Sequence, residues 1–275
     1  MIIVSLYGPF NWARYGAEAA EEENLLQSFA TTQKHNSHIS RHKLLSFYWQ
    51  FNLFPRFVGK LGRTINSQFL TKQQANLHEL GKQYFASLVA QKISAQTNIF
   101  HAYSAFQEPC WDQCEKLGVK KVIEWSIAHP YFLNEILEEE SQHLGIELKS
   151  KADSARILSE LDRADQVVIP SSFVKNSFLQ YAFSQDKLLL NPFGSDTELF
   201  HPRPRKRPIG PLRIATAGAL SIRKGVIYLL KAVRQLKLSK IPCELYLFGG
   251  WKTEQLKELG ESYDDCITHM GGVPH

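Results

Sequence analysis

Short aliphatic or β-branched runs alternate with longer stretches of helical periodicity through most of the 275 residues. This alternation is typical of βαβ units that share a parallel sheet. We expect strands over residues 2–7, 98–103, 120–126, 166–170 and 187–191. We expect helices near residues 16–31, 104–117, 130–144, 152–163 and 171–183. The sequence therefore predicts an α/β protein with Rossmann-like units.

A change in amino-acid composition after Phe200 marks the clearest domain boundary. The segment HPRPRKRPIGPLR contains four prolines and five basic residues, which can neither continue a helix nor pair as a central strand. We expect an N-terminal domain at 1–200, a linker at 201–211 and a second unit at 212–275. Strands at 212–217, 244–248 and 266–270 and a helix at 224–237 repeat the α/β pattern there. Because a doubly wound domain usually needs about 100–150 residues, we expect this second domain to be incomplete and the chain to be a fragment.

The segment AGALSIRKGVIYLL, residues 217–230, is the strongest candidate for a binding site. A strand ends in Gly218, and a short loop then brings Arg223, Lys224 and Gly225 to the start of a helix. Free N–H groups at a helix N-terminus and two adjacent cations favour a diphosphate. The pattern is not a Walker A loop, and no G-x-G-x-x-G occurs in the chain. The alternative is a solvated Arg–Lys pair that opens a surface helix.

Several segments together resemble the GT-B glycosyltransferases of glycosyltransferase family 4. NPFGSDTELFHP, residues 191–202, is similar to the family's Asn-Gly-Val-Asp-x-x-x-Phe-x-Pro hinge, and ADQVVIPSSFVKNSF, residues 164–178, to the strand, serine and helix before it. ALSIRKGVIYLLKA resembles the Arg-Lys-Gly donor loop, and ELYLFGG resembles the strand that follows. RYGAEAAEEENLL, residues 14–26, resembles the glycine-opened first helix. The resemblance implies a GT-B fold with two Rossmann-like domains, the first binding an acceptor and the second a nucleotide sugar.

The resemblance also implies roles for individual residues. Lys224 stands where the family contacts the donor diphosphate, with Arg223 as a second cation. Gly218 and Gly225 complete the donor loop, although Ala219 occupies a common arginine position. The remaining two implied site residues are Gly16, which would let phosphate or sugar approach the first helix closely, and His129, a catalytic candidate in IEWSIAHP. Ser126 lies at about the aligned position of the family's histidine, and a lone His beside a proline is often structural.

The implied activity is hexosyl transfer with retention, from a nucleotide-diphosphate sugar to a glycan, a lipid-linked or a small-molecule acceptor. We expect no cofactor and no metal ion, since no metal motif is visible. The family's Glu-x7-Glu motif would follow the last residue of this chain; Glu139 and Glu147 share that spacing, but they indicate a solvated helix. Two alternatives stay open: a non-catalytic GT-B remnant that binds a nucleotide, a membrane surface or a partner, and a nucleotide-sugar epimerase of GT-B architecture.

Charge and cysteine content bear on location and partners. The formal net charge is only +5, but residues 31–96 contain nine basic residues and one acidic residue. Within 41–63, apolar residues recur at helical spacing with cations opposite, so this segment could lie on an anionic membrane surface, or it could pack on the sheet. No nucleic-acid motif accompanies the charge. Four cysteines, an N-terminus without a signal pattern and no spanning apolar run predict a cytoplasmic protein, with possible peripheral contact at the membrane's inner face.

Overall fold

The computed structural model describes residues 1–6, 12–32, 39–46, 80–103, 105–147, 154–195, 197–198, 200–202, 210–263 and 267–273. The chain forms two compact units. The first comprises Met1–Pro130 and Asp153–Gly194, and the second comprises Tyr131–Ala152 and Ser195–His275. The second unit therefore takes a segment from the middle of the predicted first domain.

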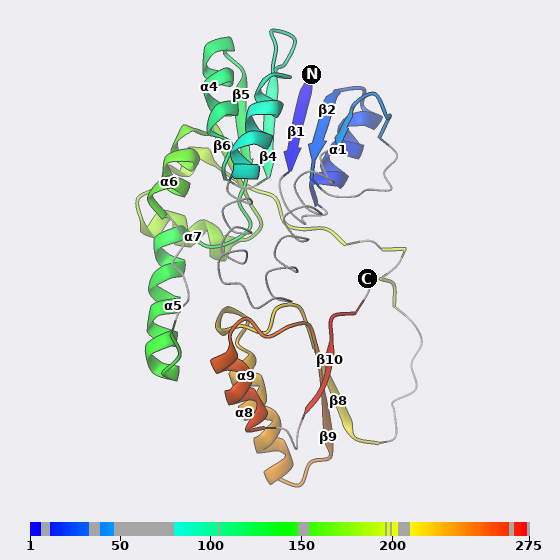
Figure 1. The fold of residues 1–275 in the computed structure, drawn as a ribbon, viewed down its shortest axis with the longest axis vertical. Coiled ribbons are helices and arrows are strands. Elements are labelled where there is room, and N and C mark those ends of the chain that lie inside the picture. Colours follow the sequence, from blue (N-terminus) through cyan, green and yellow to red (C-terminus); the bar gives the residue numbers. More distant parts are fainter. Residues whose placement is uncertain are drawn as a thin grey trace, which may run out of the picture. The chain divides into compact units, whose positions relative to one another are not determined.

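The first unit is built on a seven-stranded sheet in the order β3-β2-β1-β4-β5-β6-β7 (Figure 1). All of its paired strands are parallel. The strands are β1 (Ile2–Leu6), β2 (Leu26–Thr31), β3 (Leu44–Ser46), β4 (Ile99–Tyr103), β5 (Lys120–Glu124), β6 (Gln166–Ile169) and β7 (Leu188–Leu190). The order runs outward from β1 in one direction and from β4 in the other, so the topological switch point lies between these two strands.

Helices cover both faces of this sheet. Helix α1 (Trp12–Glu22) packs on β1 and β2, where Val4, Leu6 and Phe29 form a buried cluster. The opposite face carries a larger core around Phe100, Trp111 and other buried side chains. The helical segments that contribute to that core are residues 80–90, α4 (Glu108–Leu117), α6 (Ser154–Arg163) and α7 (Ser172–Gln180). Burial of these apolar faces is the main stabilising contribution to the unit.

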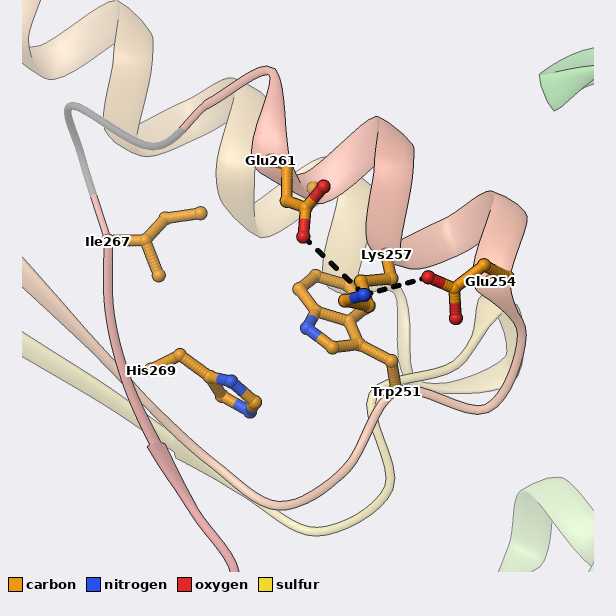
Figure 2. Close-up of a pocket in the computed structure, with 7 residues that line it drawn as sticks. Trp251, Glu254, Lys257, Glu261, Ile267 and His269 are labelled. Atoms are coloured by element: carbon orange, nitrogen blue, oxygen red, sulfur yellow. Dashed lines mark hydrogen bonds and ion pairs between the residues drawn. The ribbon is translucent and has the colours of Figure 1, made fainter. Parts of the chain in front are cut away.

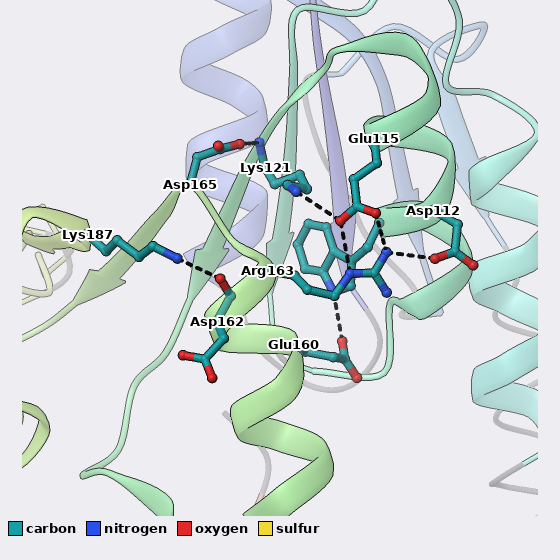
Figure 3. Close-up of polar contacts among 9 residues, drawn as sticks. Asp112, Glu115, Lys121, Glu160, Asp162, Arg163, Asp165 and Lys187 are labelled. Atoms are coloured by element: carbon teal, nitrogen blue, oxygen red, sulfur yellow. Dashed lines mark hydrogen bonds and ion pairs between the residues drawn. The ribbon is translucent and has the colours of Figure 1, made fainter. Parts of the chain in front are cut away.

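Polar contacts link α6 to α4, and α4 to β5 (Figure 3). Arg163 pairs with Asp112 at 2.7 Å and with Glu115 at 3.0 Å, and Glu115 also contacts Lys121 at 3.1 Å. Below them, the buried Glu160 accepts hydrogen bonds from the indole of Trp111 and from two backbone amides at the start of α4. Its carboxylate therefore satisfies donors that a helix N-terminus would otherwise leave open.

The second unit has a three-stranded parallel sheet in the order β10-β9-β8. Its elements are β8 (Leu212–Ala217), α8 (Val226–Leu238), β9 (Cys243–Phe248), α9 (Glu254–Glu261) and β10 (Ile267–Gly271), together with α5 (Pro130–Leu144). The core contains Leu230, Leu245 and Leu247, and Ile146, just after α5, is buried among them. The Tyr228 hydroxyl also donates to Glu140 of α5 at 2.7 Å.

The structure corrects two secondary-structure predictions. The helix expected over 16–31 ends at Glu22, and Leu26–Thr31 forms β2, because pairing with β1 buries that strand on both faces. The amphipathic segment expected over 41–63 does not begin as a helix, since Leu44–Ser46 pairs with β2 as β3. Its remaining residues, 47–63, lie outside the described residues. Among the helices that are described, none is both long and apolar enough to span a membrane.

The predicted division at 1–200, 201–211 and 212–275 stays a prediction in its exact limits. Residues 203–209 of the expected linker lie outside the described residues. The strand expected at 212–217 is present as β8, and those near 244 and 266 are present as β9 and β10. The expected fold class, two Rossmann-like units with parallel sheets, is confirmed by the topology.

Candidate functional site

The carboxyl ends of β8 and β9 meet at two glycines of the second unit. Gly218 has a φ of +116°, and its amide donates to Phe248 at 2.9 Å. Gly249 has a φ of +131°, and a Cβ there would lie 1.9 Å from the carbonyl oxygen of Gly218. Side chains are therefore excluded where the two loops pass each other. This close approach fixes the path of the chain into the Arg223–Lys224 segment.

That segment forms a single 3-10 turn, Ile222–Lys224, which ends at Gly225. Gly225 has a φ of +66°, and its amide donates to the carbonyl of Ile222 at 2.8 Å. The left-handed conformation suits glycine and turns the chain directly into α8. Buried Val226, Ile227 and Leu230 anchor this helix to the core.

Arg223 and Lys224 lie at this junction with exposed side chains. Neither side chain makes a hydrogen bond or an ion pair with any residue that the structure describes. We call Gly218, Arg223, Lys224 and Gly225 the cation loop. Both cations stand beside the N-terminal end of a helix of 13 residues, whose dipole also favours an anion. The structure thus brings the predicted donor-binding residues together in one loop.

A cavity of about 500 Å³ lies between α9 and β10 of the same unit (Figure 2). It is lined by Trp251, Glu254, Lys257, Gly260, Glu261, Ile267 and His269. Lys257 is held by Glu254 at 2.7 Å and Glu261 at 3.7 Å, so its charge is already compensated. None of the predicted site residues lines this cavity. It is therefore a separate feature from the cation loop.

The catalytic candidate His129 is buried in the first unit, with 3% of its surface exposed. Its imidazole stacks on Tyr181 at 4.5 Å and meets Phe178 edge-on at 5.1 Å. Its backbone amide donates to the hydroxyl of Ser177 at 2.9 Å. This arrangement favours the packing alternative that the sequence also offered. The catalytic role of His129 stays a prediction.

The structure provides a packing reason for Gly16. A Cβ at this position would lie 2.8 Å from the hydroxyl oxygen of Tyr103. Gly16 therefore lets the end of β4 approach α1 closely. The role expected of Gly16, close approach of phosphate or sugar, stays a prediction.

Three polar side chains that the sequence analysis did not single out gather at the ends of β4 and β5. We call His101, Tyr103 and Glu124 the switch-point cluster. The His101 Nε2 atom lies 3.8 Å from a Glu124 carboxylate oxygen, and the rings of His101 and Tyr103 stack at 4.9 Å. The signal that could have found it is the presence of polar residues inside predicted buried strands, where apolar residues are usual.

Burial shifts the pKa of each of these three groups in the direction that favours its neutral form. It lowers the pKa of His101 to about 4 and raises the pKa of Glu124 to about 7. Burial, together with the nearby Glu124, raises the pKa of the Tyr103 phenol. Such perturbation is common at functional sites, although buried structural groups show it too. In the part of the chain that the structure describes, no group of three or more His, Cys, Asp or Glu side chains could hold a metal ion.

Comparison with known proteins supports the fold. No family model matches the chain. It is 29% identical over 119 residues to WcaL of Escherichia coli strain K12, which is named as a glycosyltransferase of colanic acid biosynthesis. That match covers 42% of this chain, and the chain spans 29% of the relative's length.

Solved structures match the chain over its full length. An E. coli structure described as trehalose-6-phosphate bound with UDP-2-fluoro glucose has a TM-score of 0.59 at 9% identity, with 74% of it covered. A UDP-forming trehalose-phosphate synthase from Burkholderia xenovorans, in complex with glucose-6-phosphate, has a TM-score of 0.53 at 10% identity, with 75% covered. At such identities the likeness establishes the fold alone. The chain has the GT-B fold class; membership of family 4 stays a prediction.

Proposed function

We propose that this chain belongs to a glycosyltransferase that moves a sugar from a nucleotide-diphosphate donor to a hydroxyl-bearing acceptor. The observation that carries the proposal is the cation loop: two exposed cations without partners among the described residues, held beside the start of α8. The similarity to WcaL, a protein named as a glycosyltransferase, supports the same conclusion. The fold likeness to structures solved with UDP-2-fluoro glucose and with glucose-6-phosphate adds support for a sugar nucleotide and a sugar acceptor.

In the proposed reaction, the bond between the sugar and the donor diphosphate breaks while the acceptor oxygen bonds to the same sugar carbon. Negative charge then develops on the departing diphosphate. Arg223, Lys224 and the first amides of α8 would stabilise that charge more strongly in the transition state than in the ground state. These groups are cationic or dipolar parts of the chain itself, so we propose that the step uses no metal ion.

Finer features of the activity are also proposals. We propose transfer of a hexosyl group with retention, in line with the family resemblance and with a matched structure of trehalose-6-phosphate synthase, an enzyme described as transferring glycosyl groups with retention. That structure matches with a TM-score of 0.55 at 9% identity. We propose a glycan or a lipid-linked glycan as the acceptor, and a cytoplasmic enzyme that can contact the inner face of the membrane through residues 41–63.

Calorimetric titration of the 275-residue chain with UDP and with GDP tests the donor site. We expect one of these nucleotides to bind, and we expect Lys224→Ala to abolish the binding heat. Lys231→Ala is the matched control, because Lys231 lies within α8, away from the 3-10 turn that holds Lys224, and rests over Tyr228. Circular dichroism first establishes that each variant is folded. Equal binding by both variants, or no nucleotide binding by the folded wild-type chain, would contradict the proposal.

A further inference from the structure

The switch-point cluster lies on one face of the first sheet, at its carboxyl edge. Tyr103 and Glu124 are register partners at the last positions of β4 and β5, and His101 lies two residues earlier on β4. Because alternate residues of a strand share a face, all three belong to the same face. On β1, the partners of His101 and Tyr103 are Val4 and Leu6, which pack against α1.

The hydrogen-bonding capacity of this cluster is unused within the described residues. The Nε2 atom of His101 is buried and has no hydrogen-bond partner. The Tyr103 hydroxyl and the Glu124 carboxylate also make no hydrogen bond to any described residue. Buried polar groups in folded proteins are nearly always paired, with protein, water or a ligand. The His101 Nε2 atom is such a buried, unpaired group, and the Tyr103 hydroxyl and the Glu124 carboxylate beside it add further unused hydrogen-bonding capacity among the described residues. Together they indicate that something polar binds here.

The location of the cluster agrees with a ligand site. In open parallel sheets, ligands bind at the carboxyl ends of the strands next to the switch point, and β4 is one of the two strands that flank it. The cluster is not sealed: the side chains of His101 and Glu124 are 22% and 16% exposed. A small group can therefore reach the Glu124 carboxylate from solvent.

The chemistry of the cluster selects the type of ligand. No described Lys or Arg pairs with Glu124, so a phosphate or carboxylate would meet an uncompensated negative charge. A neutral hydroxyl can donate to the carboxylate and accept from the phenol of Tyr103, and a neutral imidazole can serve either way. Neighbouring hydroxyls on one ring would satisfy several of these groups at once.

We propose that His101, Tyr103 and Glu124 form a subsite that binds neutral hydroxyl groups of a carbohydrate in the first unit. Its identification as the acceptor side of a transferase rests on the function proposed above. Gly16 is a positioning residue here, because its missing side chain leaves room for the Tyr103 hydroxyl beside α1. The subsite thereby favours an uncharged sugar ring over a sugar phosphate at this point.

Nuclear magnetic resonance of the 275-residue chain tests the subsite directly. The probes are glucose, galactose, mannose and N-acetylglucosamine in the millimolar range, and the signal is the His101 imidazole, assigned by its loss in His101→Gln. We expect at least one sugar to shift this signal in a saturable way. We expect Glu124→Gln and Tyr103→Phe to weaken that sugar's affinity about tenfold or more. Glu23→Gln, at an exposed position, is the matched control and should leave it unchanged.

The dependence of affinity on pH separates binding by Glu124 from a packing role. Among the described residues, the titratable groups that face this carboxylate are His101 and Tyr103 of β4, and its partner on β6 is the uncharged Val168. Because an ionised carboxylate accepts stronger hydrogen bonds, affinity should rise as pH increases through about 7, the pKa of Glu124, and stay flat in Glu124→Gln.

Two results would overturn the subsite: no shift of the His101 signal by any of the four sugars, or equal affinities in Glu124→Gln and Glu23→Gln. A UDP and GDP titration of the same sample keeps the two proposals apart. Nucleotide binding without sugar binding contradicts only the subsite. Sugar binding without nucleotide binding contradicts the proposed transferase and leaves the carbohydrate subsite standing.

Discussion

The cation loop and the switch-point cluster hold polar groups in opposite ways. Arg223 and Lys224 are exposed, and a short turn anchored by glycine and an apolar helix presents them to solvent. His101, Tyr103 and Glu124 lie within a sheet, where burial shifts each pKa toward the neutral form. The first arrangement keeps full charge for an anionic ligand. The second reduces charge and leaves hydrogen-bonding groups for a neutral one.

The largest effect on the cation loop should come from Gly249→Ala. The new Cβ would lie 1.9 Å from the Gly218 carbonyl at a φ of +131°, so backbone must move. We expect a loss of about 3 kcal/mol or more of unfolding free energy, together with loss of nucleotide binding. Urea unfolding followed by circular dichroism measures the first, and calorimetry the second. Gly250→Ala, where a Cβ meets nothing within 4 Å, is the matched control.

Lys224→Ala should separate function from stability in the same loop. In a form of the protein that catalyses transfer, we expect a roughly hundredfold loss of rate, about 3 kcal/mol of transition-state stabilisation. The unfolding free energy should change by no more than about 0.5 kcal/mol, because the exposed side chain has no partner among the described residues. Steady-state kinetics and urea unfolding provide the two values. A rate change below about threefold would exclude Lys224 from the role assigned to it.

Glu124→Gln should change how stability depends on pH. Because the pKa of Glu124 is raised in the folded state, its contribution to the unfolding free energy is present below the ordinary pKa of 4.5 and is lost as pH rises to about 7. The lowered pKa of His101 acts oppositely, since its contribution is lost as pH falls from 6.5 to about 4. In the wild type, the unfolding free energy therefore receives two opposite contributions between pH 4.5 and 6.5: that of Glu124 falls with rising pH, and that of His101 rises.

Removing the carboxylate leaves only the histidine slope. Urea unfolding of Glu124→Gln at several pH values should therefore show stability that rises with pH from about 4 to 6.5. Glu23→Gln, at an exposed position, should keep the wild-type profile. A profile of Glu124→Gln that matches the wild type would show that these two groups do not titrate as a buried pair.

The smallest effect should come from Lys257→Ala. This lysine pairs with Glu254 and Glu261 on the surface of α9, and exposed ion pairs contribute about 0–1 kcal/mol. Urea unfolding should therefore detect a loss below about 1 kcal/mol, and nucleotide binding should persist. Loss of nucleotide binding in Lys257→Ala would instead show that the α9 cavity and the cation loop belong to one nucleotide-binding site.

Most of the fold and only part of the candidate site follow from the sequence. Local patterns were enough for β8 and for α5, which begin and end where the sequence predicts. The prediction of a helix over 16–31 was wrong in its second half, because pairing with β1, rather than local periodicity, makes Leu26–Thr31 a strand. Such pairing joins residues far apart in the chain and leaves little local trace.

The same dependence on long-range pairing explains why the cation loop could be predicted from the sequence and the switch-point cluster could not. Arg223, Lys224 and Gly225 are consecutive, so their arrangement at a helix start is visible in the sequence. His101 and Glu124 become neighbours only through the register of β4 with β5. The pKa shifts of this pair depend on burial by the assembled sheet, which no short segment specifies.

The second unit is discontinuous in the chain, because it combines α5 with elements that begin beyond Ser195. During synthesis, α5 leaves the ribosome well before β8, β9 and α9 exist. Ile146 is buried in the folded core, but the residues that bury it are translated later, so its packing contacts cannot form when α5 is made. Folding of this unit consequently has to follow synthesis of β8, β9 and α9, rather than the vectorial order that a contiguous unit would allow.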